Sequence, residues 1–137
     1  MSDKLATILM VLMMFCHVVD DFYLQGILAK LKQKAWWKEN APDEKYEDDY
    51  VVALLVHAFS WSVMITAPYI VMMLVQQEYK ITAVWIGTLL CNTIIHAVVD
   101  TLKCNRGVIN LWTDQSIHAI QVIVTSVVLA INWGLTE

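Results

Sequence analysis

The stretch Asn92–His118, NTIIHAVVDTLKCNRGVINLWTDQSIH, decides the fold because it joins the end of one apolar run to the start of the next. A short polar turn at residues 103–110 separates the two runs. A connection this short predicts two neighbouring antiparallel helices. Ionisable residues are costly in apolar helices and indicate a functional site there. Five of them flank the turn: His96, Asp100, Lys103, Asp114 and His118.

The chain as a whole is too apolar for an ordinary soluble domain. Hydrophobic residues make up 58% of the 137 residues and charged residues only 16%, whereas soluble domains average roughly 45–50% and about 25%. We therefore expect an integral membrane protein in contact with the lipid bilayer, folded as one domain over residues 1–137. The net charge of -4, without a basic stripe, argues against a nucleic-acid partner.

Four apolar runs predict four membrane-spanning helices. Each run is about 20 residues or longer, which is enough to cross a hydrocarbon core of roughly 30 Å. Pro68 lies inside the second run, where we expect a kink rather than a helix end. The expected fold class is all-α, an up-down four-helix bundle in the membrane. The helices should span about residues 5–28, 51–76, 81–103 and 112–134, with a loop at 30–50.

The loop at residues 30–50, KLKQKAWWKENAPDEKYEDDY, is the one long connection. Its basic first half carries Trp36 and Trp37, which suits either a short helix lying flat at the membrane interface or a solvated loop. By the positive-inside rule, this loop and the ionisable cluster face the cytoplasm, and both termini lie outside. The count behind this orientation is Lys30, Lys32, Lys34, Lys38, Lys45, Lys103 and Arg106 against Lys4 and Lys80.

Each predicted helix carries one histidine, about 9 to 12 Å inside its cytoplasmic end. Three of these histidines have an aspartate four residues away, which places an imidazole and a carboxylate on one helix face. This pairing predicts a site for a divalent metal, zinc before manganese or iron. The candidate ligands are His17, Asp21, His57, His96, Asp100 and His118.

Hydrogen bonding between helices is the alternative explanation for these polar residues. One histidine or one aspartate would be explained that way, whereas four histidines at one level exceed what packing needs. His57 is the weakest ligand candidate, because it has no carboxylate four residues away.

A divalent ion in such a site would lower the pKa of a bound water to about 7, which suits attack on an ester, an amide or a phosphoryl group. Asp114 would then be a general base or a further ligand. Lys103 would contact an anionic group of the substrate.

Three motifs, His17-x-x-x-Asp21, His96-x-x-x-Asp100 and Asp114-Gln115-x-x-His118, carry a resemblance to an uncharacterised family of small integral membrane proteins encoded by phages and bacteria. The resemblance covers about His17 to His118. It implies a phage or bacterial source and a location in the bacterial inner membrane, and it implies no activity. The chain also resembles, more faintly, bacterial membrane proteins labelled as metal-dependent hydrolases.

These observations lead to three functional hypotheses. The first is a metal-dependent hydrolase that acts at the cytoplasmic leaflet on a lipid-linked or membrane-proximal substrate. The second is a channel or carrier for protons or divalent metal that uses the same cluster. The third is a phage membrane protein that binds a host membrane component. A homo-oligomer could also form through small residues such as Gly87 or Ala83.

Overall fold

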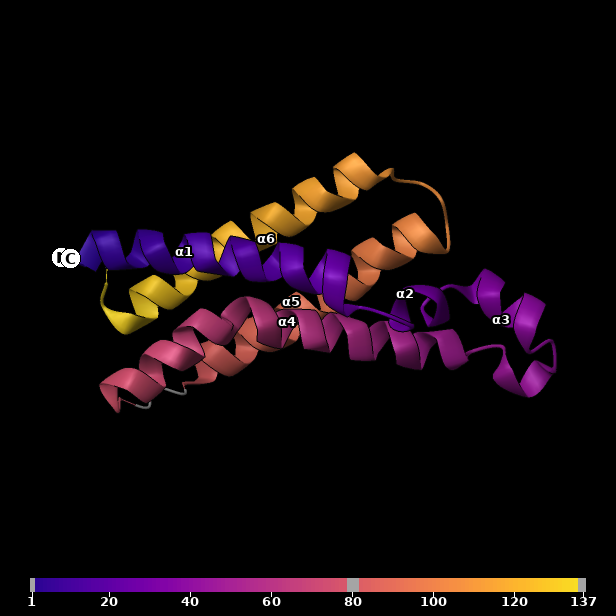
Figure 1. Cartoon of the computed structure of the whole chain (residues 1–137), viewed down its shortest axis with the longest axis horizontal. Coiled ribbons are helices and arrows are strands. Elements are labelled where there is room, and N and C mark those ends of the chain that lie inside the picture. Colours follow the sequence, from indigo (N-terminus) through magenta and orange to yellow (C-terminus); the bar gives the residue numbers. More distant parts are fainter. Residues whose placement is uncertain (1, 79–81, 136–137) are drawn as a thin grey trace.

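The computed structural model describes residues 2–78 and 82–135. Four long helices run alternately up and down, so that α1 begins and α6 ends at the same end of the bundle (Figure 1). This confirms the predicted all-α four-helix bundle. The long helices are α1 (Ser2–Val19), which continues into the π-helical turn η1 (Asp20–Leu24), α4 (Asp49–Gln76), α5 (Ala83–Cys104) and α6 (Leu111–Trp133).

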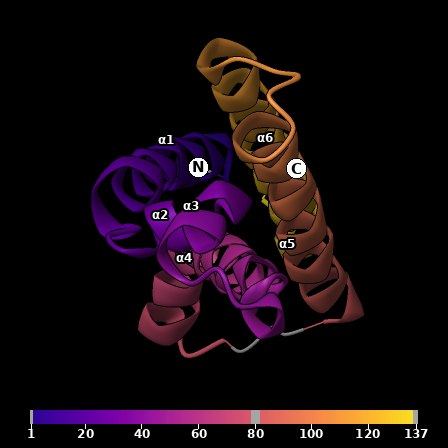
Figure 2. The ribbon, with the colours of Figure 1, turned by 90° about the vertical axis from the view of Figure 1, so that its right-hand side faces the viewer.

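The four helices pack in a ring. Helix α1 contacts α4 and α6, and α5 contacts the same two helices from the other side. Seen along the bundle, α1 and α4 lie on one side, and α5 and α6 lie next to each other on the opposite side (Figure 2). Each neighbouring pair is antiparallel, and short connections join α4 to α5 and α5 to α6.

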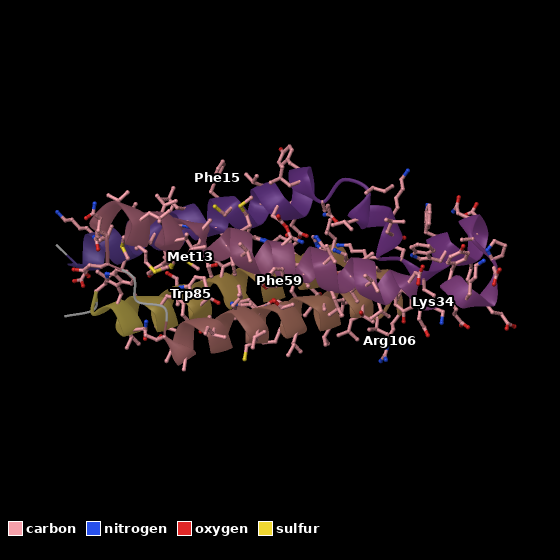
Figure 3. All side chains as sticks on the ribbon, turned by 90° about the horizontal axis from the view of Figure 1, so that it is seen from below. Met13, Phe15, Lys34, Phe59, Trp85 and Arg106 are labelled. Carbon is pink, nitrogen blue, oxygen red and sulfur yellow. The ribbon has the colours of Figure 1, made fainter. Side chains whose placement is uncertain are left out.

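All four helices, α1 together with η1, are long and apolar enough to cross a membrane. The outer surface of the bundle is rich in large apolar side chains. Phe15 is 65% exposed and points away from the bundle, whereas the nearby Met13 is fully buried inside it (Figure 3). An apolar exterior of this kind fits a hydrocarbon surrounding and points to an integral membrane protein.

The first helix ends earlier than the predicted range 5–28. Its last helical residue is Leu24, because Gly26 has a φ of 49°, a left-handed conformation that a helix cannot contain. Much of the predicted loop is helical as well. It folds into α2 (Leu28–Leu31), α3 (Lys34–Asn40) and the 3-10 turn η2 (Glu44–Tyr46).

The starts of α5 and α6 are set by capping side chains. Thr82 Oγ1 accepts a hydrogen bond from the backbone N–H of Trp85, and Asn110 Oδ1 accepts one from that of Thr113. The predicted start of the third helix at Ile81, like Lys80, lies outside the described residues. Helix α4 continues through Pro68 without ending there.

The interior of the bundle is divided into two halves. The apolar half, toward the chain termini, is a continuous core that includes Leu9, Ile65, Tyr69, Met72 and Leu129. The polar half, toward α2 and the α5–α6 connection, buries histidines, aspartates and a lysine, with a small apolar cluster of Leu54, Ala58 and Ala97 beside them. This division places the candidate site near one end of the bundle.

Candidate metal centre

A stack of aromatic rings forms the inner boundary of the site. The His96 ring of α5 lies between Trp61 of α4 and His118 of α6, with ring centroids 4.2 Å and 4.1 Å away. His57 of α4 approaches from the side, and its Nε2 is 3.2 Å from Nε2 of His96. Three of the four predicted histidines therefore meet at one level of the bundle.

Asp100 lies at the centre of these histidines. Its Oδ2 is 3.5 Å from Nε2 of His57 and 3.8 Å from Nε2 of His96, which stands one turn earlier on α5. Its Oδ1 is 3.9 Å from Nε2 of His118. One fully buried carboxylate thus faces imidazoles from three elements.

Asp21 enters the site from η1. Its Oδ1 is 3.5 Å from Nε2 of His57, and its Oδ2 accepts a hydrogen bond of 2.5 Å from Nε2 of Gln115. The Gln25 side-chain amide also donates to the backbone carbonyl of Asp21. The same Gln115 amide nitrogen lies 3.0 Å from Oδ2 of Asp114, so Gln115 connects η1 to α6.

Asp114 and Lys103 form the side of the site nearest the α5–α6 connection. Asp114 Oδ1 is 3.5 Å from Nε2 of His118, and its Oδ2 accepts a hydrogen bond of 2.5 Å from Nζ of Lys103. Lys103 Nζ also lies 4.0 Å from Oδ1 of Asp100. The Lys103 side chain remains 23% exposed, whereas both aspartates are fully buried. This lysine therefore lies at the opening of the site.

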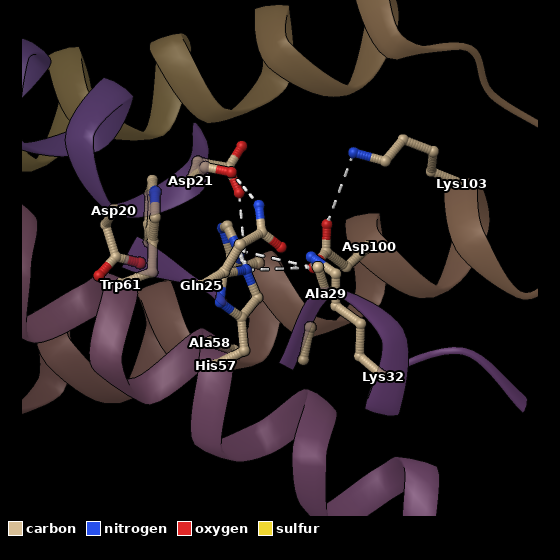
Figure 4. Close-up of polar contacts among 12 residues, drawn as sticks. Asp20, Asp21, Gln25, Ala29, Lys32, His57, Ala58, Trp61, Asp100 and Lys103 are labelled. Carbon is tan, nitrogen blue, oxygen red and sulfur yellow. Dashed lines mark hydrogen bonds and ion pairs between the residues drawn. The ribbon is translucent and has the colours of Figure 1, made fainter. Parts of the chain in front are cut away.

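Lys32 is an unexpected member of the cluster. It belongs to the predicted interfacial loop, yet its ammonium group is buried and donates to Oδ2 of Asp100 at 2.6 Å. Asn105 holds this segment in place. Its Nδ2 donates to the carbonyl of Lys32 at 3.1 Å, and its Oδ1 accepts from the backbone N–H of Lys34 at 2.7 Å. Lys32 and Lys103 reach Asp100 at different oxygens, Lys32 from the turn after α2 and Lys103 from α5 (Figure 4).

Buried histidines and aspartates form three overlapping groups that could hold a metal ion. Within each group, one possible ligand atom of every residue lies within 4.8 Å of the others. The groups share Asp21, His96 and His118, so they describe one connected site. They are Asp21, His57 and His96; His96, Asp100 and His118; and Asp21, Asp114 and His118.

Several nitrogen and oxygen atoms of this site that could bind a metal lack a hydrogen bond. A polar atom buried without a hydrogen-bond partner lowers the stability of the fold by about 1–3 kcal/mol. A divalent ion would satisfy nitrogen and carboxylate oxygen donors together, and the set suits zinc, manganese or iron alike. The residues present therefore fit a metal. Within residues 2–78 and 82–135, the buried atoms of the site without a hydrogen bond are Oδ1 of Asp21, Asp100 and Asp114, Nδ1 of His96 and Nε2 of His118.

His17, the fourth predicted histidine, lies beside the three groups. Its Nδ1 accepts a hydrogen bond of 3.0 Å from the indole N–H of Trp61, and its ring centroid is 6.0 Å from that of His118. The neighbouring Asp20 is also buried beside the three groups. Its Oδ1 accepts a hydrogen bond of 3.4 Å from the hydroxyl of Ser60. From the first helix, the three candidate groups thus include Asp21 but neither Asp20 nor His17.

Two residues of the site were missed by sequence reasoning. Trp61 had a usable signal, since it lies four residues after His57 and therefore on the same helix face. Lys32 had none, because it is one of five lysines within residues 30–45 and its neighbours do not distinguish it.

Comparison with known proteins places the chain in no family. No family model matches it, and neither does any curated protein or solved structure. The resemblance to small phage and bacterial membrane proteins therefore receives no support from these comparisons.

Proposed function

We propose that this protein is a membrane-embedded, metal-dependent hydrolase that acts on a lipid-linked or membrane-proximal substrate. The observation that carries the proposal is the set of five buried nitrogen and carboxylate oxygen atoms on η1, α5 and α6 that have no hydrogen bond, beside the two ammonium groups of Lys32 and Lys103. A purely structural network would pair its own donors and acceptors.

The charges of the site support a divalent ion together with an anionic substrate. Asp21, Asp100 and Asp114 carry three formal negative charges, and the two lysines offset two of them. One divalent ion would reverse the net sign from negative to positive. The positive site would then attract an anion, and Lys103 at its opening is placed to receive one.

Each residue has a distinct role in this proposal. His57, His96, His118, Asp21 and Asp100 hold the metal, and His17 supports it through Trp61 or as an additional ligand. The metal would acidify a bound water and polarise the scissile group. Asp114 is a ligand or the general base, since its Oδ1 is free of hydrogen bonds while Lys103 and Gln115 fix its Oδ2.

A site that opens at one end favours an enzyme over a channel. Beyond Trp61 the bundle interior is mostly apolar, with Ile65, Tyr69 and Leu129 between the site and the far end. The hydroxyls of Ser62 and Thr66, buried in the same region, donate to backbone carbonyls of their own helix. A conducting path would need polar groups along that length. The Lys and Arg count favours the cytoplasmic leaflet as the side of the opening, although Lys80 of that count lies outside the described residues.

One observation favours the carrier as a second candidate. A chain of hydrogen bonds leaves the site along α5 and α6, from His118 Nδ1 to Oε1 of Gln121 at 3.0 Å, and from Gln121 to Oδ1 of Asn92 at 3.3 Å. Asn92 donates in turn to Oγ1 of Thr125 at 2.7 Å. The side-chain amides of this chain would not relay protons themselves, but they supply polar groups along part of the route that a transported ion would take.

Metal analysis by mass spectrometry on detergent-purified protein tests the proposal. We expect stoichiometric zinc, manganese or iron in the wild type and its loss in a His96→Ala, Asp100→Ala double variant. The metal-loaded protein should then hydrolyse phosphatidylglycerol in vesicles, and product release should disappear in Asp114→Asn. Metal without hydrolysis, but with ion flux into proteoliposomes, would support the carrier. A folded wild type without metal would refute the hydrolase and a metal carrier, and would leave a proton carrier, which proton flux into proteoliposomes would test.

A further inference from the structure

A groove of about 570 Å³ runs between α5 and α6 on the outer face of the bundle. Its sides are apolar, and Ile95, Ile120 and Val124 are each about half exposed there. Gly87 leaves room within the groove, because a Cβ built at this residue would meet no atom within 4 Å. Since both helices are long and apolar enough to span a bilayer, the groove opens toward hydrocarbon.

The groove has a polar floor that belongs to the hydrogen-bond chain leaving the metal centre. Asn92, Gln121 and Thr125 line it, and each of them is almost completely buried. Gln121 contacts the groove and also lies 3.0 Å from Nδ1 of His118. The groove and the candidate ligands thus share a wall.

The dimensions of the groove indicate which kind of molecule binds there. A helix with its side chains is about 10 Å wide, so an open groove of this size would hold only a short stretch of one. A hydrocarbon chain is narrow enough to lie along the groove. The lining of α5 from Val84 to Ile95 is about 17 Å long at the helical rise per residue. It ends directly before His96, so a chain lying there would point its polar end toward the site.

We propose that the α5–α6 groove binds the hydrocarbon chain of an anionic membrane lipid, whose head group is thereby directed to the metal centre at Lys103. The proposal rests on the proposed function, since it names the lipid as the substrate class of that hydrolase. The surrounding bilayer is as apolar as the groove, so placing the hydrocarbon chain of the lipid between α5 and α6 would add little binding free energy from the hydrophobic effect. Its contribution would be to position the head group.

Native mass spectrometry of the full chain in detergent, with added phosphatidylglycerol and zinc, tests this inference. The test variant is Gly87→Trp, because Gly87 lines the groove, a Cβ there meets no atom within 4 Å, and an indole at this residue would occupy groove volume. The control is Ile86→Trp, which adds the same side chain to a half-exposed residue on the opposite face of α5. Helical content by circular dichroism verifies that both variants fold.

We expect the wild type and Ile86→Trp to retain bound phosphatidylglycerol, and Gly87→Trp to retain roughly tenfold less, because the indole occupies the volume of the chain. All three should retain equal zinc. Phosphatidylcholine with the same chains should be retained less well than phosphatidylglycerol, because Lys103 recognises the anionic head group.

Equal retention by Gly87→Trp and Ile86→Trp would overturn the groove proposal, as would a dimer of the wild type that Gly87→Trp disrupts without any change in bound lipid. If zinc binds and lipid retention is unaffected, the groove proposal fails alone. If lipid retention follows the expected pattern but neither the wild type nor the variants bind zinc, the lipid site is supported and the proposed hydrolase function is refuted.

Discussion

The apolar half and the polar half of the bundle are built on the same four helices but are stabilised differently. In the apolar half, side chains such as Ile65 and Leu129 fill the interior by shape alone. In the polar half, every buried charge depends on a partner from another element, as Asp100 depends on Lys32. From this difference we expect that damage to the apolar half leaves the chemistry of the site intact. Loss of a single partner in the polar half should instead affect both the site and the stability of the fold.

The largest effect should come from breaking the central ion pair of the polar half. Asp100→Leu removes the partner of a buried ammonium group, and such a change typically costs about 3–5 kcal/mol of stability. Unfolding in mixed detergent micelles would measure it, together with complete loss of bound metal. The double variant Asp100→Leu, Lys32→Met should recover much of the stability and none of the metal. A double variant no more stable than the single one would contradict the importance of this pair.

Damage to the apolar half should leave the site intact. Leu129→Ala leaves a cavity in a fully packed region and should lower the free energy of unfolding by about 2–3 kcal/mol. Metal content, measured below the new unfolding midpoint, should equal that of the wild type. Loss of metal together with stability would mean that the two halves are not separable.

Within the polar half, two adjacent aspartates allow a sharper comparison. Asp21→Asn should weaken metal binding by at least about tenfold, because Asp21 lies in two of the three candidate groups. Asp20→Asn is the matched control, since Asp20 is equally buried and lies in none of them. Titration with a fluorescent zinc chelator as competitor would compare the two. Equal weakening would show that the candidate groups do not identify the ligands.

The smallest effect is expected at the boundary between the halves. Trp61→Phe keeps an aromatic ring against His96 but removes the indole N–H that His17 Nδ1 accepts. Loss of this hydrogen bond should cost about 1 kcal/mol, and metal affinity should hardly change. If zinc affinity instead falls as far as in Asp21→Asn, His17 and its orientation by Trp61 are part of the ligand set.

The sequence predicts the four helices and their alternation because long charge-free runs have few other ways to fold in a bilayer. It also predicts that His96 and Asp100 share a face, because their spacing is local. Contacts between distant segments are harder to predict. Nothing local to Lys32 indicates that Asn105, 73 residues away, will fix its backbone and direct its ammonium group to the site.

Helix 1 shows the same limit at a single turn. The spacing of His17 and Asp21 predicts an α-helical pair, yet the π-helical turn η1 begins at Asp20, and Asp21 faces His57 and Gln115 instead. The pattern of apolar residues contains no sign of this turn, because π-helical turns are rare and depend on the packing around them.

The π-helical turn has a consequence for the history of the site. The backbone N–H of Gln25 bonds to the carbonyl of Asp20, five residues earlier, so η1 holds one residue more than an α-helical turn would. Deleting that residue would rotate everything after it by about 100° relative to the rest of α1. A single codon gained or lost in the gene would therefore change how η1, with Asp21, and the segment that follows it meet the site, while leaving the other long helices in place. When chains of this type are compared, a change in length at this turn would be more informative than a substitution.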